Sequence, residues 1–191
     1  MVSRSESGGH MKKTIAQWQI AGFICTCIAG TLLHFLFDWT QQHVVAALFS
    51  AVNESIWEHM KLIYYPMLAF ALIEYRCWGR ETAYFWCVKL RGILLALVLI
   101  PAIYYMYTGI LGRSADWFNI TIFFIAAGAA YRQETLRFRN IRAYMLPQWA
   151  AIGLICLIGI LFVLLTFVPP HIPLFQDPVT GSFGFYRYAI S

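Results

Sequence analysis

The sequence predicts an all-α integral membrane protein, organised as a polytopic helix bundle. Its 191 residues are 60% hydrophobic and 17% aromatic, and only 12% are charged, which is more apolar than a soluble domain of this size requires. The apolar residues gather into long runs, and each crossing of a bilayer takes about 20 such residues. The runs lack the ten-residue alternation of apolar and polar positions that a membrane barrel needs. Helices are therefore the expected spanning elements.

Five segments are long and apolar enough to be expected membrane helices. Lys12 and Lys13 precede the first one, as in a signal peptide, but the run is too long and no small-residue cleavage site follows it. We divide the chain into a disordered cytoplasmic tail at 1–13, a transmembrane domain at 14–168 and an extracytoplasmic C-terminal segment at 169–191. The five expected helices span Thr14–Phe37, Ser55–Tyr75, Val88–Ile110, Trp117–Tyr131 and Pro147–Val168.

A short apolar stretch separates the first two expected helices. It runs from His43 to Val52, and at about ten residues it is too short to cross the bilayer. The stretch is therefore interfacial, re-entrant or a continuation of the second helix. The last alternative would bring the acidic residues that follow close to the middle of the membrane, and would favour a transport pathway over chemistry at the surface.

The positions of the basic residues predict the orientation, because cytoplasmic loops collect Lys and Arg. With the N-terminus in the cytoplasm, all but Lys61, Arg113 and Arg187 of the fourteen basic residues lie on the inner side. We expect a multi-pass protein of the cell inner (plasma) membrane, with its C-terminus outside. Its basic loops would face anionic headgroups, and no nucleic-acid partner is expected. Glu74, Arg76 and Glu81 are expected to form ion pairs at the inner interface, of little functional content.

Ionisable residues crowd the start of the second expected helix. At 3.6 residues per turn, Glu54, Glu58 and Lys61 would share one face and form a polar stripe, and His59 lies beside it. Ionisable groups in a membrane segment are costly and commonly functional. A structural role fits the same residues, because Ser55 and Glu58 match a helix capping box and Lys61 can neutralise a carboxylate.

Two other segments bring histidines and carboxylates to the outer side. His34 and Asp38 are i, i+4 neighbours, an arrangement in which a carboxylate can orient an imidazole as a metal ligand or general base. In the C-terminal segment, two prolines end the last helix and Asp-Pro-x-Thr-Gly signals a turn. We expect this apolar segment to fold back as a lid that brings His171 and Asp177 towards the polar stripe. The alternative is a tail on the headgroups, with His171 in solvent.

Three motifs stand out: His34-Phe35-x-Phe37-Asp38-Trp39, Asn53-Glu54-Ser55-x-Trp57-Glu58-His59-x-Lys61 and Pro170-His171-x-Pro173-Leu174-Phe175-x-Asp177-Pro178-x-Thr180-Gly181. Their combination resembles a family of small bacterial multi-pass membrane proteins known only as a domain of unknown function, and this resemblance implies no activity. A looser comparison is with the ceramidase-like membrane hydrolases, which use a Ser, an Asp and three His around zinc. The chain departs from them, with five expected helices instead of seven and no pair of histidines four residues apart in the last helix.

The leading hypothesis is an outward-facing membrane enzyme, a metal-dependent hydrolase that acts on a lipid or lipid-linked substrate. Imidazole-rich ligation with a carboxylate favours zinc. Nearby carboxylates and a lysine ammonium would orient the metal ligands or act as general acid and general base. The expected metal ligands are His34, His59, His171 and Asp177. The expected catalytic residues are Glu54, Glu58, Lys61 and Asp38.

Two alternative functions remain open. A transporter, channel or ligand-binding protein would use Glu54, Glu58 and Lys61 to bind a cation or relay protons. Because five helices show no obvious inverted repeat, that function would depend on a homo-oligomer. A non-catalytic subunit would instead use the lid to dock a partner. Membrane lipids are expected partners in every case.

Overall fold

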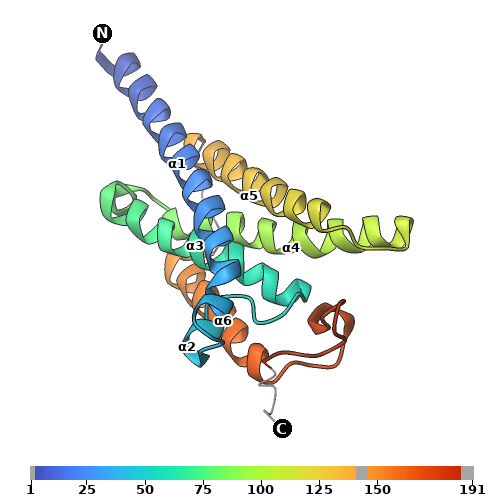
Figure 1. The fold of residues 1–191 in the computed structure, drawn as a ribbon. Coiled ribbons are helices and arrows are strands. Elements are labelled where there is room, and N and C mark those ends of the chain that lie inside the picture. The colour runs from blue at the N-terminus through green and yellow to red at the C-terminus, as the bar shows by residue number, and fades with distance from the viewer. Residues whose placement is uncertain (1–2, 141–145, 186–191) are drawn as a thin grey trace.

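A computed structural model describes residues 3–140 and 146–185, with side chains from residue 14 onward except that of Asp116. The described part is all-α, as predicted, with five long helices, one short helix and two 3₁₀ turns (Figure 1). An isolated bridge between Gln176 and Phe183 is the one strand-like pairing in these ranges. The elements are α1 (Ser3–Trp39), α2 (Val44–Ala47), α3 (Ile56–Cys77), η1 (Gly79–Glu81), α4 (Phe85–Leu111), α5 (Asp116–Arg139), α6 (Gln148–Phe167) and η2 (Pro173–Phe175).

Three of the long helices are apolar and long enough to cross a membrane. They are Thr14–Trp39 within α1, the whole of α4 and the whole of α6. Helices α3 and α5 carry more charge, but Glu58, Lys61, Glu74 and Glu134 are buried against neighbouring helices and do not face the surroundings. The three apolar helices indicate association with a membrane. Crossing by α3 and α5 stays a prediction.

The first helix begins earlier than the sequence indicates. α1 starts at Ser3, so its backbone is helical through most of the segment 1–13 that we assigned to a tail. This stretch has no proline, so every residue in it has the backbone N–H that a continuous helix needs, although Gly8 and Gly9 are weak helix formers.

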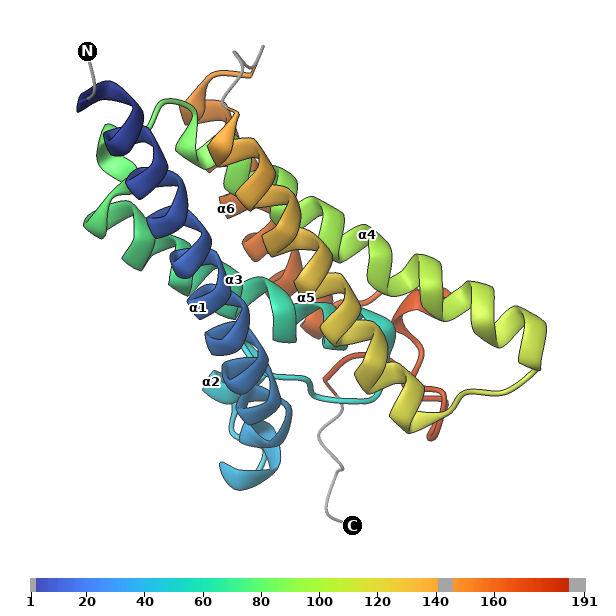
Figure 2. The same ribbon diagram turned by 90° about the horizontal axis from the view of Figure 1, so that it is seen from above.

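The long helices pack closely where small residues face a neighbour. α4 contacts α5 and α6, and α1 contacts both α3 and α5 (Figure 2). In α5, Ala126, Ala127 and Ala130 are completely buried. At Gly30 of α1, a Cβ atom would lie 2.6 Å from the carbonyl oxygen of Leu62 in α3. Small side chains thus allow the close helix contacts that are typical of membrane bundles.

The stretch between α1 and α3 forms a separate short helix. The ring Nδ1 of His43 caps α2 by accepting a hydrogen bond from the backbone N–H of Val45, at 3.2 Å. Ala47 is buried in a small cluster with Phe37 at the end of α1. Because α2 ends at Ala47 and α3 begins at Ile56, this stretch does not continue α3. The carboxylates of the polar stripe therefore lie at the head of α3.

The segment after α6 folds back onto the start of α3. The ring centroids of Trp57 in α3 and Phe175 in η2 lie 4.7 Å apart. Further along, the backbone N–H of Phe185 donates to the carbonyl oxygen of Thr166 near the end of α6, at 2.8 Å. The fold-back is a feature of the described structure. Its role as an extracytoplasmic lid stays a prediction.

Candidate functional site

The turn before α3 is fixed by hydrogen bonds from its own side chains. Ser55 is the N-cap, and its hydroxyl accepts from the backbone N–H of Glu58 at 3.4 Å, as the capping-box pattern predicts. Asn53 Oδ1 accepts from the backbone N–H of Ser55 at 3.0 Å. Glu58 Oε2 accepts from the backbone N–H of Val52 at 3.1 Å. Glu54 thus lies just before the helix, in a turn that these hydrogen bonds hold in place.

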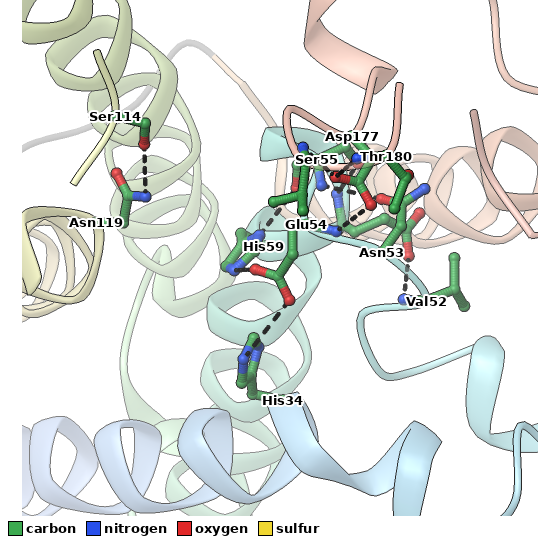
Figure 3. Close-up of polar contacts among 12 residues, drawn as sticks. His34, Val52, Asn53, Glu54, Ser55, His59, Ser114, Asn119, Asp177 and Thr180 are labelled. Carbon is green, nitrogen blue, oxygen red and sulfur yellow. Dashed lines mark hydrogen bonds and ion pairs between the residues drawn. The ribbon is translucent and has the colours of Figure 1, made fainter. Parts of the chain in front are cut away.

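His34, Glu54 and His59 converge at this turn (Figure 3). Nε2 of His59 lies 3.4 Å from Glu54 Oε2, and Nε2 of His34 lies 3.9 Å from Glu54 Oε1. The two imidazole centroids are 5.3 Å apart. One ligand atom from each residue lies within 4.8 Å of the others. We call these three residues the His–Glu–His group.

The spacing of the His–Glu–His group is compatible with a divalent metal ion. Zinc bonds of about 2.0–2.1 Å in tetrahedral geometry place the ligand atoms about 3.4 Å from one another. The observed separations of 3.4 Å and 3.9 Å run to different oxygens of Glu54, and the three ligand atoms lie within 4.8 Å of one another, so binding of an ion would need them to move closer by up to about 1.4 Å. The same three side chains can also form a metal-free cluster, because a protonated imidazole pairs with a carboxylate.

The second nitrogen of His59 is held by the backbone. Nδ1 lies 2.9 Å from the carbonyl oxygen of Ser55. Because a carbonyl oxygen only accepts, Nδ1 carries the proton in this bond, and in the neutral ring the lone pair is at Nε2, facing Glu54. This arrangement is typical of metal-binding histidines, whose outer N–H donates to a carbonyl or carboxylate.

Asp177 contacts the backbone of the His–Glu–His group and is not itself a member of the group. Its side chain is buried, and Oδ1 accepts from the backbone N–H groups of Val179 at 2.7 Å and Thr180 at 3.2 Å. Oδ2 accepts from the backbone N–H of Glu54 at 3.4 Å. The carboxylate that we expected to bind metal therefore fixes the turn of the C-terminal segment and the backbone of Glu54.

Asp38 and His171 lie outside the His–Glu–His group. Asp38 is exposed on α1, one turn after His34. His171 is exposed, and its ring packs on Phe183 with centroids 4.7 Å apart. The fold-back therefore brings Asp177 to the start of α3, while His171 contacts its own segment.

Glu58 and Lys61 form a buried ion pair, with Lys61 Nζ 2.5 Å from Glu58 Oε2 and side chains at most 1% exposed. Nζ also donates to the carbonyl oxygen of Ala47 at 2.9 Å and to Thr166 Oγ1 at 3.0 Å. The Thr166 hydroxyl in turn donates to Glu58 Oε1 at 2.9 Å. All three ammonium protons are used, so the pair ties α2, α3 and α6 together.

The predicted polar stripe is thus divided. Helical spacing applies only from Ile56, where α3 begins, and Glu54 precedes it in the capping turn. Glu54 consequently faces the two imidazoles, whereas Glu58 and Lys61 are enclosed between helices.

A second buried cluster was missed by the sequence analysis. Lys89 of α4 forms ion pairs with Glu74 of α3 and with Glu134 of α5, and Gln19 Nε2 of α1 donates to Glu74 Oε1 at 2.7 Å. All four side chains are at most 2% exposed. Glu74 therefore has a buried partner on another helix, in place of the expected interface ion pair beside Arg76. Lys89 itself could have indicated this cluster, because a lysine within the long apolar run of α4 needs a counter-charge.

The fold and the polar groups define a helical, membrane-associated protein with a His–Glu–His group at the head of one helix. The model of a Family of unknown function (DUF6512) matches residues 9–185, so the chain belongs to this family. The match confirms the resemblance to an uncharacterised family. No curated protein and no solved structure matches the chain, and none of these comparisons links it to the ceramidase-like hydrolases.

Proposed function

We propose that the protein is a zinc-dependent hydrolase that acts from the outer face of the membrane on a lipid or lipid-linked substrate. The observation that carries this proposal is the contact between His59 Nδ1 and the carbonyl oxygen of Ser55. It directs the Nε2 lone pair of His59 towards the point that His34 and Glu54 also approach. Three protein ligands at a partly exposed position leave a fourth position for water or substrate, as in catalytic zinc sites.

The residues around this point would have different roles in binding the metal ion and in catalysis. His34, Glu54 and His59 would hold the ion, and Asp177 would keep the Glu54 backbone in place. A zinc ion supplies Lewis-acid polarisation of an ester or phosphoester oxygen. Asp38, exposed one turn after His34, is the nearest free carboxylate along α1 and would act as the general base. Glu58 and Lys61 would position α3, because both are buried and paired.

A shallow, open apolar groove supports a lipid substrate. Its volume is about 540 Å³, and it lies along α1 and α3, the helices that carry His34 and His59. Its lining includes Leu32, Leu36, Trp39, Phe49, Tyr65 and Pro66. An alkyl chain would fit such a surface, while its polar headgroup would remain at the end of the bundle.

Metal analysis of the full chain, purified in detergent without chelators, tests this proposal. We expect near-stoichiometric zinc in the wild type and its loss in His34→Ala and His59→Ala. His171→Ala is the matched control, since His171 lies outside the group, and it should keep its zinc. A wild type without zinc, or zinc retained in His59→Ala, contradicts the proposed site.

Asp38→Asn separates catalysis from metal binding. We expect this variant to keep its zinc but to hydrolyse a panel of fluorescent ester and phosphodiester lipids about 100-fold or more slowly, because it lacks the general base. Wild-type levels of turnover in Asp38→Asn would remove Asp38 from the reaction. A zinc-bound wild type that hydrolyses no lipid in the panel would leave the site as a binding site only.

Transport through the polar stripe draws less support from the geometry. Glu58 and Lys61 satisfy one another and Thr166, which leaves Glu54 as the one exposed residue of the stripe. Flux measured in liposomes that contain the zinc-free wild type distinguishes this alternative, since a carrier would need no metal.

A further inference from the structure

The ionisable side chains enclosed by α3, α4 and α5 do not balance in charge. Lys89 supplies one positive charge, whereas Glu74 and Glu134, which both pair with it, supply two negative charges when ionised. The three side chains are at most 2% exposed, so water does not compensate for the excess. A buried charge without a counter-charge is strongly destabilising. We call these three residues the Glu–Lys–Glu cluster.

Among the residues that the structure describes, the groups that face the Glu–Lys–Glu cluster supply no second positive charge. Among the described residues, Lys89 makes every ion pair of the two carboxylates. Aromatic rings surround its ammonium: Nζ lies 5.7 Å from the centroid of Phe85 on α4, and 5.6 Å from those of Tyr131 and Phe138 on α5. The Tyr131 hydroxyl shares a hydrogen bond of 2.8 Å with Thr26 of α1. These neutral groups stabilise the ammonium without offsetting a second carboxylate.

One carboxylate oxygen of the cluster, Glu134 Oε1, is buried without a hydrogen-bond donor among the described residues. It lies against Gly92 of α4, where any Cβ atom would collide with it. An ionised oxygen in this place would be left without hydration or a donor. A neutral carboxyl group fits the position better.

The contact between Gln19 and Glu74 accommodates a carboxyl proton as well. Gln19 Nε2 donates to Glu74 Oε1 at 2.7 Å, and Gln19 Oε1 is buried without a partner among the described residues. With the amide turned over, a proton on Glu74 Oε1 would donate to Gln19 Oε1 at the same distance. Either carboxyl group of the cluster can therefore hold a proton.

We propose that the Glu–Lys–Glu cluster binds one exchangeable proton, shared between Glu74 and Glu134, and is electrically neutral in the folded protein. This proton site is distinct from the His–Glu–His group and does not depend on the proposed hydrolase. Glu74 follows His59 by 15 residues, which is about 22 Å along α3. Because one carboxylate comes from α3 and the other from α5, release of the proton would leave two buried negative charges that repel one another across these helices, with Lys89 as their one counter-charge among the described residues. Helix packing is thereby linked to pH.

Infrared spectroscopy of the purified full chain tests the proton directly. The carbonyl stretch of a protonated carboxylic acid is separate from the bands of ionised carboxylates and shifts in D₂O. At neutral pH we expect one such group per wild-type chain and none in Glu134→Gln, where Lys89 and Glu74 balance. In Lys89→Met the signal should rise about twofold, because two carboxyl groups then each need a proton. Glu81→Gln, an exposed site in η1, is the control and should match the wild type.

The pH dependence of unfolding gives a second measurement, for use if Lys89→Met does not fold. The proton is bound in the folded chain and lost on unfolding, so the wild-type Tm should fall as the pH rises from about 4.3, where an unfolded glutamate releases its proton, to the pH at which the folded cluster releases it. In Glu134→Gln this fall should disappear. A wild type without the protonated-carboxyl band, or a Glu134→Gln variant with an unchanged fall in Tm, overturns the proposal. Zinc content should be the same in wild type and Glu134→Gln, so failure here is distinguishable from failure of the metal site.

Discussion

Two glutamates four residues apart have opposite environments at the start of α3. Glu54 is half exposed and faces two imidazoles, whereas Glu58 is buried and paired with Lys61. The N-cap at Ser55 accounts for this difference, because it places Glu54 in a turn and Glu58 in the first turn of the helix. Glu54 is therefore available for binding, and Glu58 stabilises the fold.

Lys61→Met tests the structural role of the buried pair. Loss of the ammonium leaves Glu58 buried without its counter-charge, so we expect the free energy of unfolding to fall by about 3–5 kcal/mol. Chemical denaturation in detergent, followed by circular dichroism, measures the change. The double variant Glu58→Gln/Lys61→Met removes both charges and should recover a large part of the loss. Equal destabilisation of the single and double variants would contradict this role.

At the scale of elements, the apolar runs predict where the long helices lie. Expected helices at Val88–Ile110 and Pro147–Val168 correspond closely to α4 at Phe85–Leu111 and α6 at Gln148–Phe167. α5 runs to Arg139, eight residues past the expected end at Tyr131. Hydropathy alone ended this helix too early, because the added turns carry charged residues, of which Glu134 is buried against α4.

The C-terminal segment is attached at a glycine that cannot carry a side chain. Gly184 has φ of +61°, and a Cβ atom there would lie 2.5 Å from the carbonyl oxygen of Thr166. We expect Gly184→Ala to break the adjoining hydrogen bond between Phe185 and Thr166 and to release the segment. Limited proteolysis of the purified protein should then cut residues 169–185 several-fold faster than in wild type.

Gly181→Ala is the matched control for this variant. Gly181 has a similar φ of +73°, but its Cβ atom would meet only Gln176 Nε2, at 3.9 Å. Both variants carry the cost of a positive φ, so the difference between them isolates the collision with α6. Equal rates of cleavage in the two variants would show that the Thr166 contact does not hold the segment.

At the scale of the whole molecule, three and five crossings give the same arrangement of the termini, because both numbers are odd. The distribution of Lys and Arg predicts the N-terminus inside and the C-terminus outside. Cysteine labelling in intact cells tests this in a background without the native cysteines. A membrane-impermeant maleimide should label Val179→Cys, at a position 79% exposed, in intact cells. Arg139→Cys, at an exposed position on the end of α5, should react only after lysis. The reverse pattern would invert the orientation.

The sequence predicts the helices better than their partners. Apolar runs indicate each long helix by itself, and the capping pattern indicates the start of α3. Glu74, Lys89 and Glu134 come from three helices, and no spacing within one helix shows that they meet. The same limit applies to His34, which lies 20 residues before Glu54. Such groups depend on which helices are neighbours, and helical periodicity does not specify that.

The pairing of Glu74 with Lys89 has a consequence for biogenesis. The chain is synthesised from its N-terminus, so α3 leaves the ribosome before the lysine that neutralises its glutamate. A helix with an uncompensated acid enters lipid unfavourably, whereas α3 and α4 together carry the acid and its counter-ion. The two helices, joined by the short segment around η1, therefore form the smallest piece that can insert with this charge balanced. If α3 crosses the membrane, we expect it to insert together with α4 as a helical hairpin, because of the order of these two residues in the chain.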